Sequence, residues 1–244
     1  MEDAEFVPWL TNELVTLPGV VAVALGGSRA LGAHHAASDW DFAIYYEGAF
    51  DPERLRQKCW DGEVSDVGGW GGGVMNGGAW LAMEGRRVDV HYRDLDDVLF
   101  WCAEAEVGRF QKQLLSFYVA GIPTYTVMGE LALNRVLAGN LPNPEYPDAL
   151  ASAATSRWSA DARASLEYAH AALTQREDVL TALANASRGI IEAAHGRLAH
   201  EKTWALNEKG IADAADLADL AASLFAATAP LELGAAIRRA ADSL

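Results

Sequence analysis

The apolar and polar positions of the first hundred residues follow first a helical and then an extended period. Phe6, Leu10 and Leu14 recur every four residues, which predicts an amphipathic helix over residues 3–16, closed by Pro18-Gly19. Three later runs of β-branched and aromatic residues predict strands: VVAVAL (20–25), DWDFAIYY (39–46) and RRVDVHY (86–92). One short helix or loop is expected between the first two strands.

The segments that connect and follow these strands have weaker patterns. Residues 51–60 are expected to be helical, whereas residues 68–80 (GGWGGGVMNGGAW) contain so much glycine that they predict a flexible loop or a distorted hairpin. Residues 94–119 mix helical and extended signals. A helix is expected after Gly121-Ile-Pro123 and through Leu137.

The pattern changes after residue 140. The segment GNLPNPEYP (139–147) contains three prolines and has no periodicity, so it predicts a linker. The chain beyond it is rich in alanine and has helical periodicity: Trp158, Ala162, Leu166, Ala169 and Leu173 fall on one face. We therefore expect an α+β protein with a small mixed β-sheet domain over residues 1–140 and an α-helical bundle over residues 148–244.

Composition and charge narrow the range of partners. The 244 residues are 51% hydrophobic, which is enough for an ordered core, and their formal net charge is −15. Such a field repels nucleic acid and attracts cationic small molecules. The acidic amino terminus, the two cysteines Cys59 and Cys102, and the lack of an apolar run of roughly 20 residues lead us to expect a cytoplasmic protein without membrane partners.

Two carboxylates point the same way at the start of the second predicted strand. Asp39 and Asp41 share a face because side chains alternate along a strand, while the intervening apolar residues face a core. Two such carboxylates repel each other unless a cation lies between them, and Mg²⁺ takes carboxylate oxygens at about 2.1 Å. Asp89, in VDVHY, has the same alternation and is a third candidate on the polar face of the sheet.

The residues before the paired aspartates can hold an anion. Gly26 and Gly27 allow close approach of the backbone, and Ser28 begins a turn whose N–H groups favour a phosphate. Arg29 is either a further phosphate contact or an ordinary surface arginine. The alternative for the aspartates is a solvated face of an edge strand, and for the glycines an ordinary turn.

This combination of motifs resembles a known family. The chain resembles the nucleotidyltransferase superfamily of the DNA polymerase β type, in particular small bacterial members such as the aminoglycoside nucleotidyltransferases. The residues that carry this resemblance are Gly27-Ser28, followed after ten residues by Asp39-Trp40-Asp41, and the later Asp89. The resemblance covers about residues 20–92. It implies that the Gly-Ser pair holds a nucleoside triphosphate, that the paired aspartates hold two Mg²⁺ ions, and that Asp89 joins one metal and activates the acceptor hydroxyl.

The function expected from these residues is Mg²⁺-dependent transfer of a nucleoside monophosphate, AMP from ATP, to a hydroxyl of a small, cationic acceptor such as an aminoglycoside. An antitoxin-type protein that nucleotidylates a partner protein and a non-catalytic nucleotide-binding module are the alternatives. Two features stay open. The loop with Trp70 and Trp80 either closes over an acceptor or is a mobile hairpin, and Lys209 either reaches the triphosphate or lies in a helix end at Asn207–Gly210.

Overall fold

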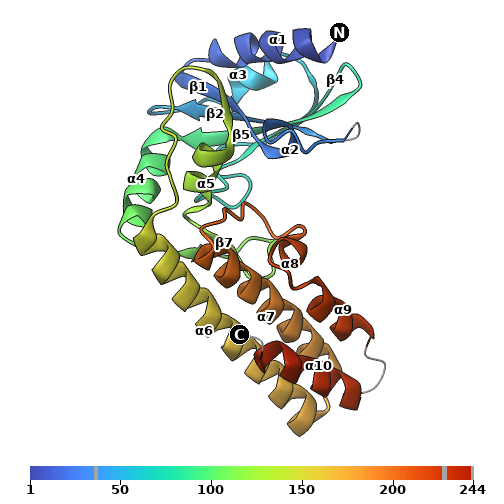
Figure 1. The fold of residues 1–244 in the computed structure, drawn as a ribbon. Helices are drawn as coiled ribbons and strands as arrows, with labels where there is room; N and C mark the ends of the chain where they lie inside the picture. Colours follow the sequence, from blue (N-terminus) through green and yellow to red (C-terminus); the bar gives the residue numbers. More distant parts are fainter. Residues whose placement is uncertain (36–37, 227–229, 243–244) are drawn as a thin grey trace. The chain divides into compact units, whose positions relative to one another are not determined.

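The computed structural model of the chain describes residues 1–35, 38–226 and 230–242 (Figure 1). These residues form two compact units. The first unit combines residues 1–103 with residues 124–145, and the second combines residues 104–123 with the chain from Tyr146 onward. The first contains a mixed sheet and the second is built mainly of helices, which confirms the expected α+β class.

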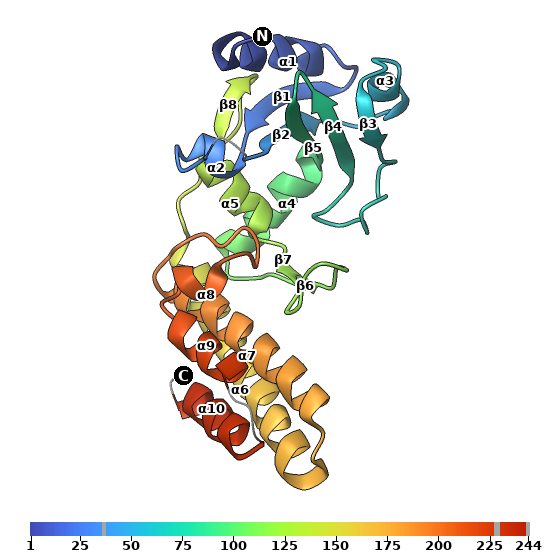
Figure 2. The same ribbon diagram turned by 90° about the vertical axis from the view of Figure 1, so that its right-hand side faces the viewer.

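The first unit is organised around a six-stranded sheet with the strand order β3-β4-β5-β2-β1-β8 (Figure 2). Its strands are β1 (Val20–Leu25), β2 (Trp40–Tyr46), β3 (Asp61–Val64), β4 (Gly78–Met83), β5 (Arg86–Asp94) and β8 (Arg135–Ala138). The neighbours β2 and β5 run parallel, whereas the other neighbouring pairs are antiparallel. A parallel pair needs a crossover, and the chain between β2 and β5 supplies it.

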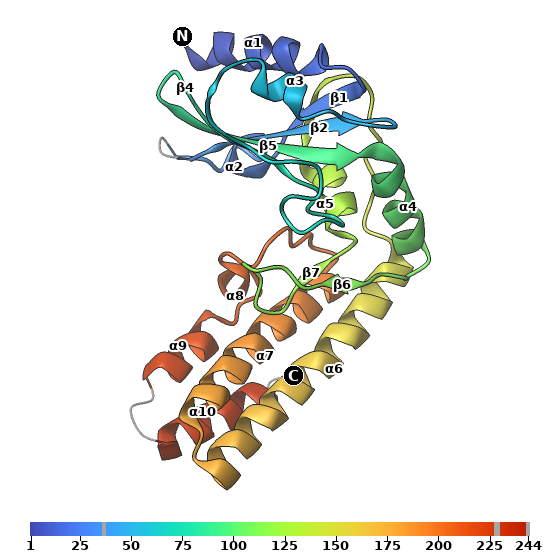
Figure 3. The same ribbon diagram turned by 180° about the vertical axis from the view of Figure 1, so that it is seen from behind.

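Helices lie on both faces of this sheet (Figure 3). They are α1 (Asp3–Val15), α2 (Gly27–Ala30), α3 (Glu53–Arg56), α4 (Leu95–Glu106) and α5 (Thr126–Leu133). The apolar stripe of α1 is fully buried against the apolar face of β2 and β5. This face follows the predicted alternation: Trp40, Phe42, Ile44, Tyr46, Val88, Val90 and Tyr92 all belong to one core. The opposite face of β2 and β5 is left for polar side chains.

The structure corrects two predicted helices of this unit. The helix expected over residues 51–60 is confined to α3, and residues 61–64 form the edge strand β3. The helix expected through Leu137 ends at Leu133, because Asn134 is extended and the next residues pair with the open edge of β1 as β8. Residues 135–138 are therefore extended because they pair with the backbone groups that β1 would otherwise leave unpaired at the edge of the sheet.

The second unit contains the two-stranded ribbon of β6 (Lys112–Gln113) and β7 (Ile122–Pro123) and five helices among the described residues. The helices are α6 (Asp148–Arg176), α7 (Val179–His200), α8 (Ile211–Ala214), α9 (Ala218–Ala226) and α10 (Pro230–Asp242). The expected helical bundle is therefore confirmed. Among the residues that the structure describes, no helix is both long enough and apolar enough to cross a membrane.

The long helices α6 and α7 form a hairpin (Figure 2). Glu177 ends α6 in the left-handed conformation, with φ at 55°, and Asp178 caps α7 by accepting a hydrogen bond from the Thr181 amide at 3.0 Å. The two helices pack closely where α7 has a small residue: a Cβ at Gly189 of α7 would lie 2.7 Å from Leu166 Cγ of α6. Gly210 does not end a helix as expected: α7 ends at His200, and Gly210 immediately precedes α8.

Candidate active site

The parallel pairing of β2 with β5 brings two of the predicted carboxylates together. Asp41 and Asp89 are register partners on these adjacent strands. His91 follows Asp89 by two residues and therefore lies on the same face of β5. One ligand atom from each of Asp41, Asp89 and His91 lies within 4.8 Å of the others, and all three residues are partly buried.

The donor atoms of this cluster fit a divalent cation. Carboxylate oxygens suit hard ions such as Mg²⁺ and Mn²⁺, and an imidazole nitrogen is a common ligand of transition metals. The Nδ1 atom of His91 is buried and makes no hydrogen bond to the described residues. His91 is not among the residues predicted from the sequence, although its two-residue spacing from Asp89 places it on the same face of the strand.

The glycine turn after β1 lies against the carboxylate of Asp41. The amide of Gly26 donates a hydrogen bond to the backbone oxygen of Asp41 at 2.7 Å. Gly27 has a φ of +60°, and a Cβ built on it would lie only 1.9 Å from Asp41 Oδ2. Glycine is therefore required at this position for both its backbone conformation and its lack of a side chain. Ser28 follows in the short helix α2, so the predicted phosphate turn and Asp41 are in direct contact.

Asp39 occupies a different position from the other two aspartates. It directly precedes β2, and its Oδ1 forms an ion pair with Arg87 Nε at 2.6 Å. Arg87 lies on β5, two residues before Asp89, so this ion pair borders the cluster on the same face. Asp39 does not belong to the group of three ligands found among residues 1–35, 38–226 and 230–242.

Arg29 holds the segment that leads into β2. Its guanidinium donates hydrogen bonds to the backbone oxygens of Ser38 at 3.0 Å and of Asp39 at 3.1 Å, and it lies 3.8 Å from the ring centroid of Trp40. These contacts position the chain immediately before Asp41. Lys209 is an exposed residue of the second unit, and its amide donates to Asn207 Oδ1 at 2.8 Å.

The polar face of β5 continues beyond the cluster. Arg87, Asp89, His91 and Arg93 alternate with buried apolar residues along the strand. Burial, together with the positive charge of Arg93, lowers the pKa of His91 to about 4, so its imidazole is neutral near pH 7. A neutral imidazole is the form that binds a metal ion.

Arg93 is anchored by a carboxylate of α5. Its Nε and Nη2 atoms each donate to one oxygen of Glu130 at 2.6 Å, and its Nη1 donates to the backbone oxygen of Tyr92 at 3.0 Å. Although burial opposes ionisation of Glu130, the charge of Arg93 and its hydrogen bonds hold the Glu130 pKa below the usual value. The pair fixes α5 to the polar face of the sheet.

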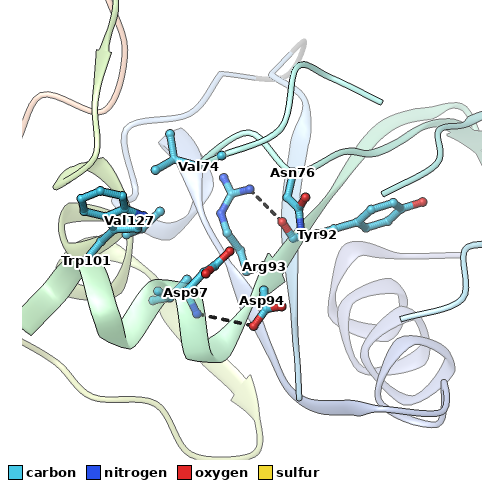
Figure 4. A pocket seen from close by; sticks show the side chains of 10 residues that line it. Val74, Asn76, Tyr92, Arg93, Asp94, Asp97, Trp101 and Val127 are labelled. Carbon is cyan, nitrogen blue, oxygen red and sulfur yellow. Dashed lines mark hydrogen bonds between the residues drawn. The ribbon is translucent and has the colours of Figure 1, made fainter. Parts of the chain in front are cut away.

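A small pocket lies at the carboxyl end of β5 (Figure 4). Its lining includes Asn76, Arg93, Asp94, Asp97 and Trp101. Asp94 accepts hydrogen bonds from the amides of Asp96 and Asp97, at 3.1 and 3.4 Å, which caps the start of α4. Burial raises the pKa of Asp97, and the neighbouring carboxylates of Asp94 and Asp96 raise it further. The hydrogen bonds of Asp94 in this pocket therefore stabilise the connection between β5 and α4.

Comparison with known proteins agrees with this geometry. The family model described as a nucleotidyltransferase domain matches residues 7–70. Residues 7–70 are therefore similar to a nucleotidyltransferase domain. The matched segment holds the glycine turn and Asp41, and the parallel pairing adds Asp89 from outside it. Nucleotidyltransferases transfer a nucleoside monophosphate, and the similarity of residues 7–70 to this domain supports that class of activity.

Among solved structures, the chain is similar to a nucleotidyltransferase-like protein from Exiguobacterium sibiricum 255-15. The two chains are 9% identical with a TM-score of 0.46, and the match covers 97% of this chain and 75% of the other. A search of curated protein sequences finds no match to the chain.

Proposed function

We propose that the protein transfers AMP from ATP to a hydroxyl group of a small, cationic acceptor such as an aminoglycoside, with release of pyrophosphate and with Mg²⁺ as the metal. The observation that carries this proposal is the direct contact of Gly27 with Asp41, together with the register pairing of Asp41 with Asp89. The glycine turn, which we propose binds phosphate, and the carboxylate cluster lie at one place on the sheet.

Each part of this site has a role in the proposed reaction. The turn at Gly27 and Ser28 holds the β- and γ-phosphates through backbone N–H groups. Asp41 and Asp89, with His91 beside them, would hold the divalent cations, and Asp39 would join them as a further ligand by exchanging its ion pair with Arg87 for a cation. A bound cation neutralises the charge on the phosphates and on the leaving pyrophosphate. Arg29 positions the chain before Asp41, and its direct contact with phosphate, like that of Lys209, stays a prediction.

In the proposed reaction, the residues of the site position the two substrates and accept one proton. The acceptor oxygen attacks the α-phosphorus, the bond between this phosphorus and the oxygen that bridges to the β-phosphate breaks, and pyrophosphate leaves. Asp89, on the strand beyond Asp41, takes the proton of the attacking hydroxyl. The net charge of −15 favours an acceptor that carries positive charge.

The test is a transfer assay with ATP labelled at the α-phosphate, Mg²⁺ and a panel of aminoglycosides, followed by mass spectrometry of the products. We expect an acceptor that gains one AMP, and no product with Asp41→Asn. Asp219→Asn, which changes an exposed acid of α9, is the matched control and keeps full activity. Label that appears only on protein would support the antitoxin-type alternative, and tight ATP binding without any transfer would support a binding module.

A further inference from the structure

Two stacked tryptophans border the carboxylate cluster on the side away from the phosphate turn. The rings of Trp70 and Trp80 lie 4.7 Å apart at an interplanar angle of 18°. Trp80 is the register partner of Asp89 on the neighbouring strand β4. Directly opposed residues of an antiparallel pair point to the same face, so the indole of Trp80 lies on the face that carries Asp41 and Asp89.

The surrounding chain fixes this aromatic pair. A Cβ built on Gly78 would lie 2.4 Å from Trp70 Cη2, so the glycine leaves the space that the Trp70 ring fills above β4. The Trp70 ring also meets the edge of His91, with 5.5 Å between the centroids at an angle of 83°. Trp70 therefore supports one face of Trp80, yet Trp80 is still 45% exposed. A large, rigid indole remains open to a ligand beside Asp89.

The order of the strands indicates which of the two substrates, the nucleotide or the acceptor, lies beside the indole of Trp80. Across the polar face, the phosphate turn after β1 is followed by Asp41 on β2, Asp89 on β5 and Trp80 on β4. An in-line displacement places the attacking oxygen opposite the leaving group. If pyrophosphate leaves toward the turn at Gly27, the acceptor approaches from the side of β4.

We propose that Trp80, supported by Trp70, is the stacking surface that binds the acceptor. This inference rests on the proposed function and adds the surface that binds the acceptor and the apolar ring face that the acceptor must present. The acceptor has a ring with an apolar face that lies on the indole and carries positive charge. Tryptophan is the strongest aromatic partner for a cation, and the neighbouring carboxylate of Asp89 adds to the attraction.

Binding calorimetry separates the two substrates. The probes are kanamycin as a cationic sugar, maltotriose as an uncharged sugar, and Mg²⁺ with α,β-methylene ATP as an unreactive nucleotide. We expect Trp80→Ala to raise the Kd of kanamycin about 10-fold, which corresponds to a cation–π contact of roughly 1 to 2 kcal/mol. The Kd of the nucleotide stays within about twofold, and Trp80→Phe regains most of the lost affinity. Maltotriose binds more weakly than kanamycin.

Matched controls and contrary outcomes make the result decisive. Trp9→Phe, in α1 on the opposite side of the sheet, leaves the affinity for both ligands unchanged. A Trp80→Ala variant that loses nucleotide and retains kanamycin would show that the indole binds the base, and the inference would be wrong. It would also be wrong if the parent binds the nucleotide in an Asp41-dependent way but does not bind kanamycin. A parent that does not bind the nucleotide contradicts the proposed function itself.

Discussion

The carboxylate of Asp41 fills the space that a side chain at residue 27 would occupy. The Cβ of any residue other than glycine there would lie 1.9 Å from Asp41 Oδ2. The proposed phosphate turn and the carboxylate cluster are therefore one unit of structure, and a change in either one is expected to displace the other.

Substitution of Gly27 by alanine tests this contact. The φ of +60° costs alanine roughly 1 to 2 kcal/mol, and the clash additionally displaces the Asp41 carboxylate. We expect Gly27→Ala to lower both nucleotide affinity and the affinity for Mn²⁺, measured by calorimetry and by electron paramagnetic resonance. Gly32→Ala is the control, since Gly32 has a similar φ of +70° with nothing within 4 Å of the added Cβ. Equal losses in both variants would attribute the effect to backbone strain alone.

Substitution of Asp89 separates binding from chemistry. Asp89 lies one strand farther from the phosphate turn than Asp41 does. We expect Asp89→Asn to bind the Mg²⁺-nucleotide complex nearly as the parent does, because Asp39 and Asp41 remain as ligands for the ion that accompanies the triphosphate. The variant should lose 10² to 10⁴-fold in single-turnover transfer, the usual contribution of a general base. Asp219→Asn should transfer at the parental rate. Unchanged turnover in Asp89→Asn would remove Asp89 from the reaction.

The ion pair between Arg93 and Glu130 should dominate the stability of its region. Glu130→Gln removes the carboxylate that binds the buried guanidinium of Arg93 through two hydrogen bonds, and the side chain of Arg93 is only 3% exposed. Loss of one partner of a buried pair costs about 3 to 5 kcal/mol, which urea unfolding would detect. Arg109 and Glu104 form an equally direct two-bonded pair, but their Arg109 end is 65% exposed. Glu104→Gln should therefore cost much less, and comparable losses would contradict the role of burial.

His195 should make the helical unit sensitive to acid. Its ring stacks on Trp158 at 4.3 Å, both of its nitrogens are buried and make no hydrogen bond to the described residues, and burial together with Lys112 lowers its pKa to about 3. The unfolded chain takes up a proton near pH 6.5, so the stability from neutral His195 is complete above that pH and is lost as the pH falls toward 3.

Replacing the imidazole with a ring that does not titrate tests this acid sensitivity. We expect His195→Phe to remove on the order of 2 kcal/mol of the stability loss between pH 6.5 and 4.5. Unfolding curves at both pH values, with the exposed His200→Phe as control, measure the difference. A parent and a His195→Phe variant with the same pH dependence would show that this histidine does not titrate as described.

Local periodicity was sufficient to find most of the first unit. The alternation in residues 39–46 correctly separated Phe42 and Ile44 from Asp41 because one face of β2 is wholly apolar. The same period placed Asp89 opposite Val88 and Val90. Periodicity could not show that these strands are parallel neighbours, since that pairing depends on the whole crossover between them.

Short segments and contacts formed by distant residues were not predictable in the same way. Residues 135–138 have no strong pattern of their own, and the free edge of β1 made them a strand. The bonds of Arg29 to Ser38 and Asp39 depend on the return of the chain after α2. His91 was not predicted because a single histidine in a strand does not by itself indicate a metal site. Its proximity to Asp41 depends on the pairing of β5 with β2.

The alternation along β5 also guards the sheet against misassembly. A slip of β5 by one residue would turn Arg87, Asp89, His91 and Arg93 toward the side of α1 and expose Val88, Val90 and Tyr92 to water. Such a mispaired sheet would bury several charges and fail to form a core. The polar side chains of β5, with Asp89 and His91 among them, therefore also help to specify the register in which the strand pairs. Variants that neutralise several of them at once should refold with more misfolded species, even where the native structure tolerates the changes.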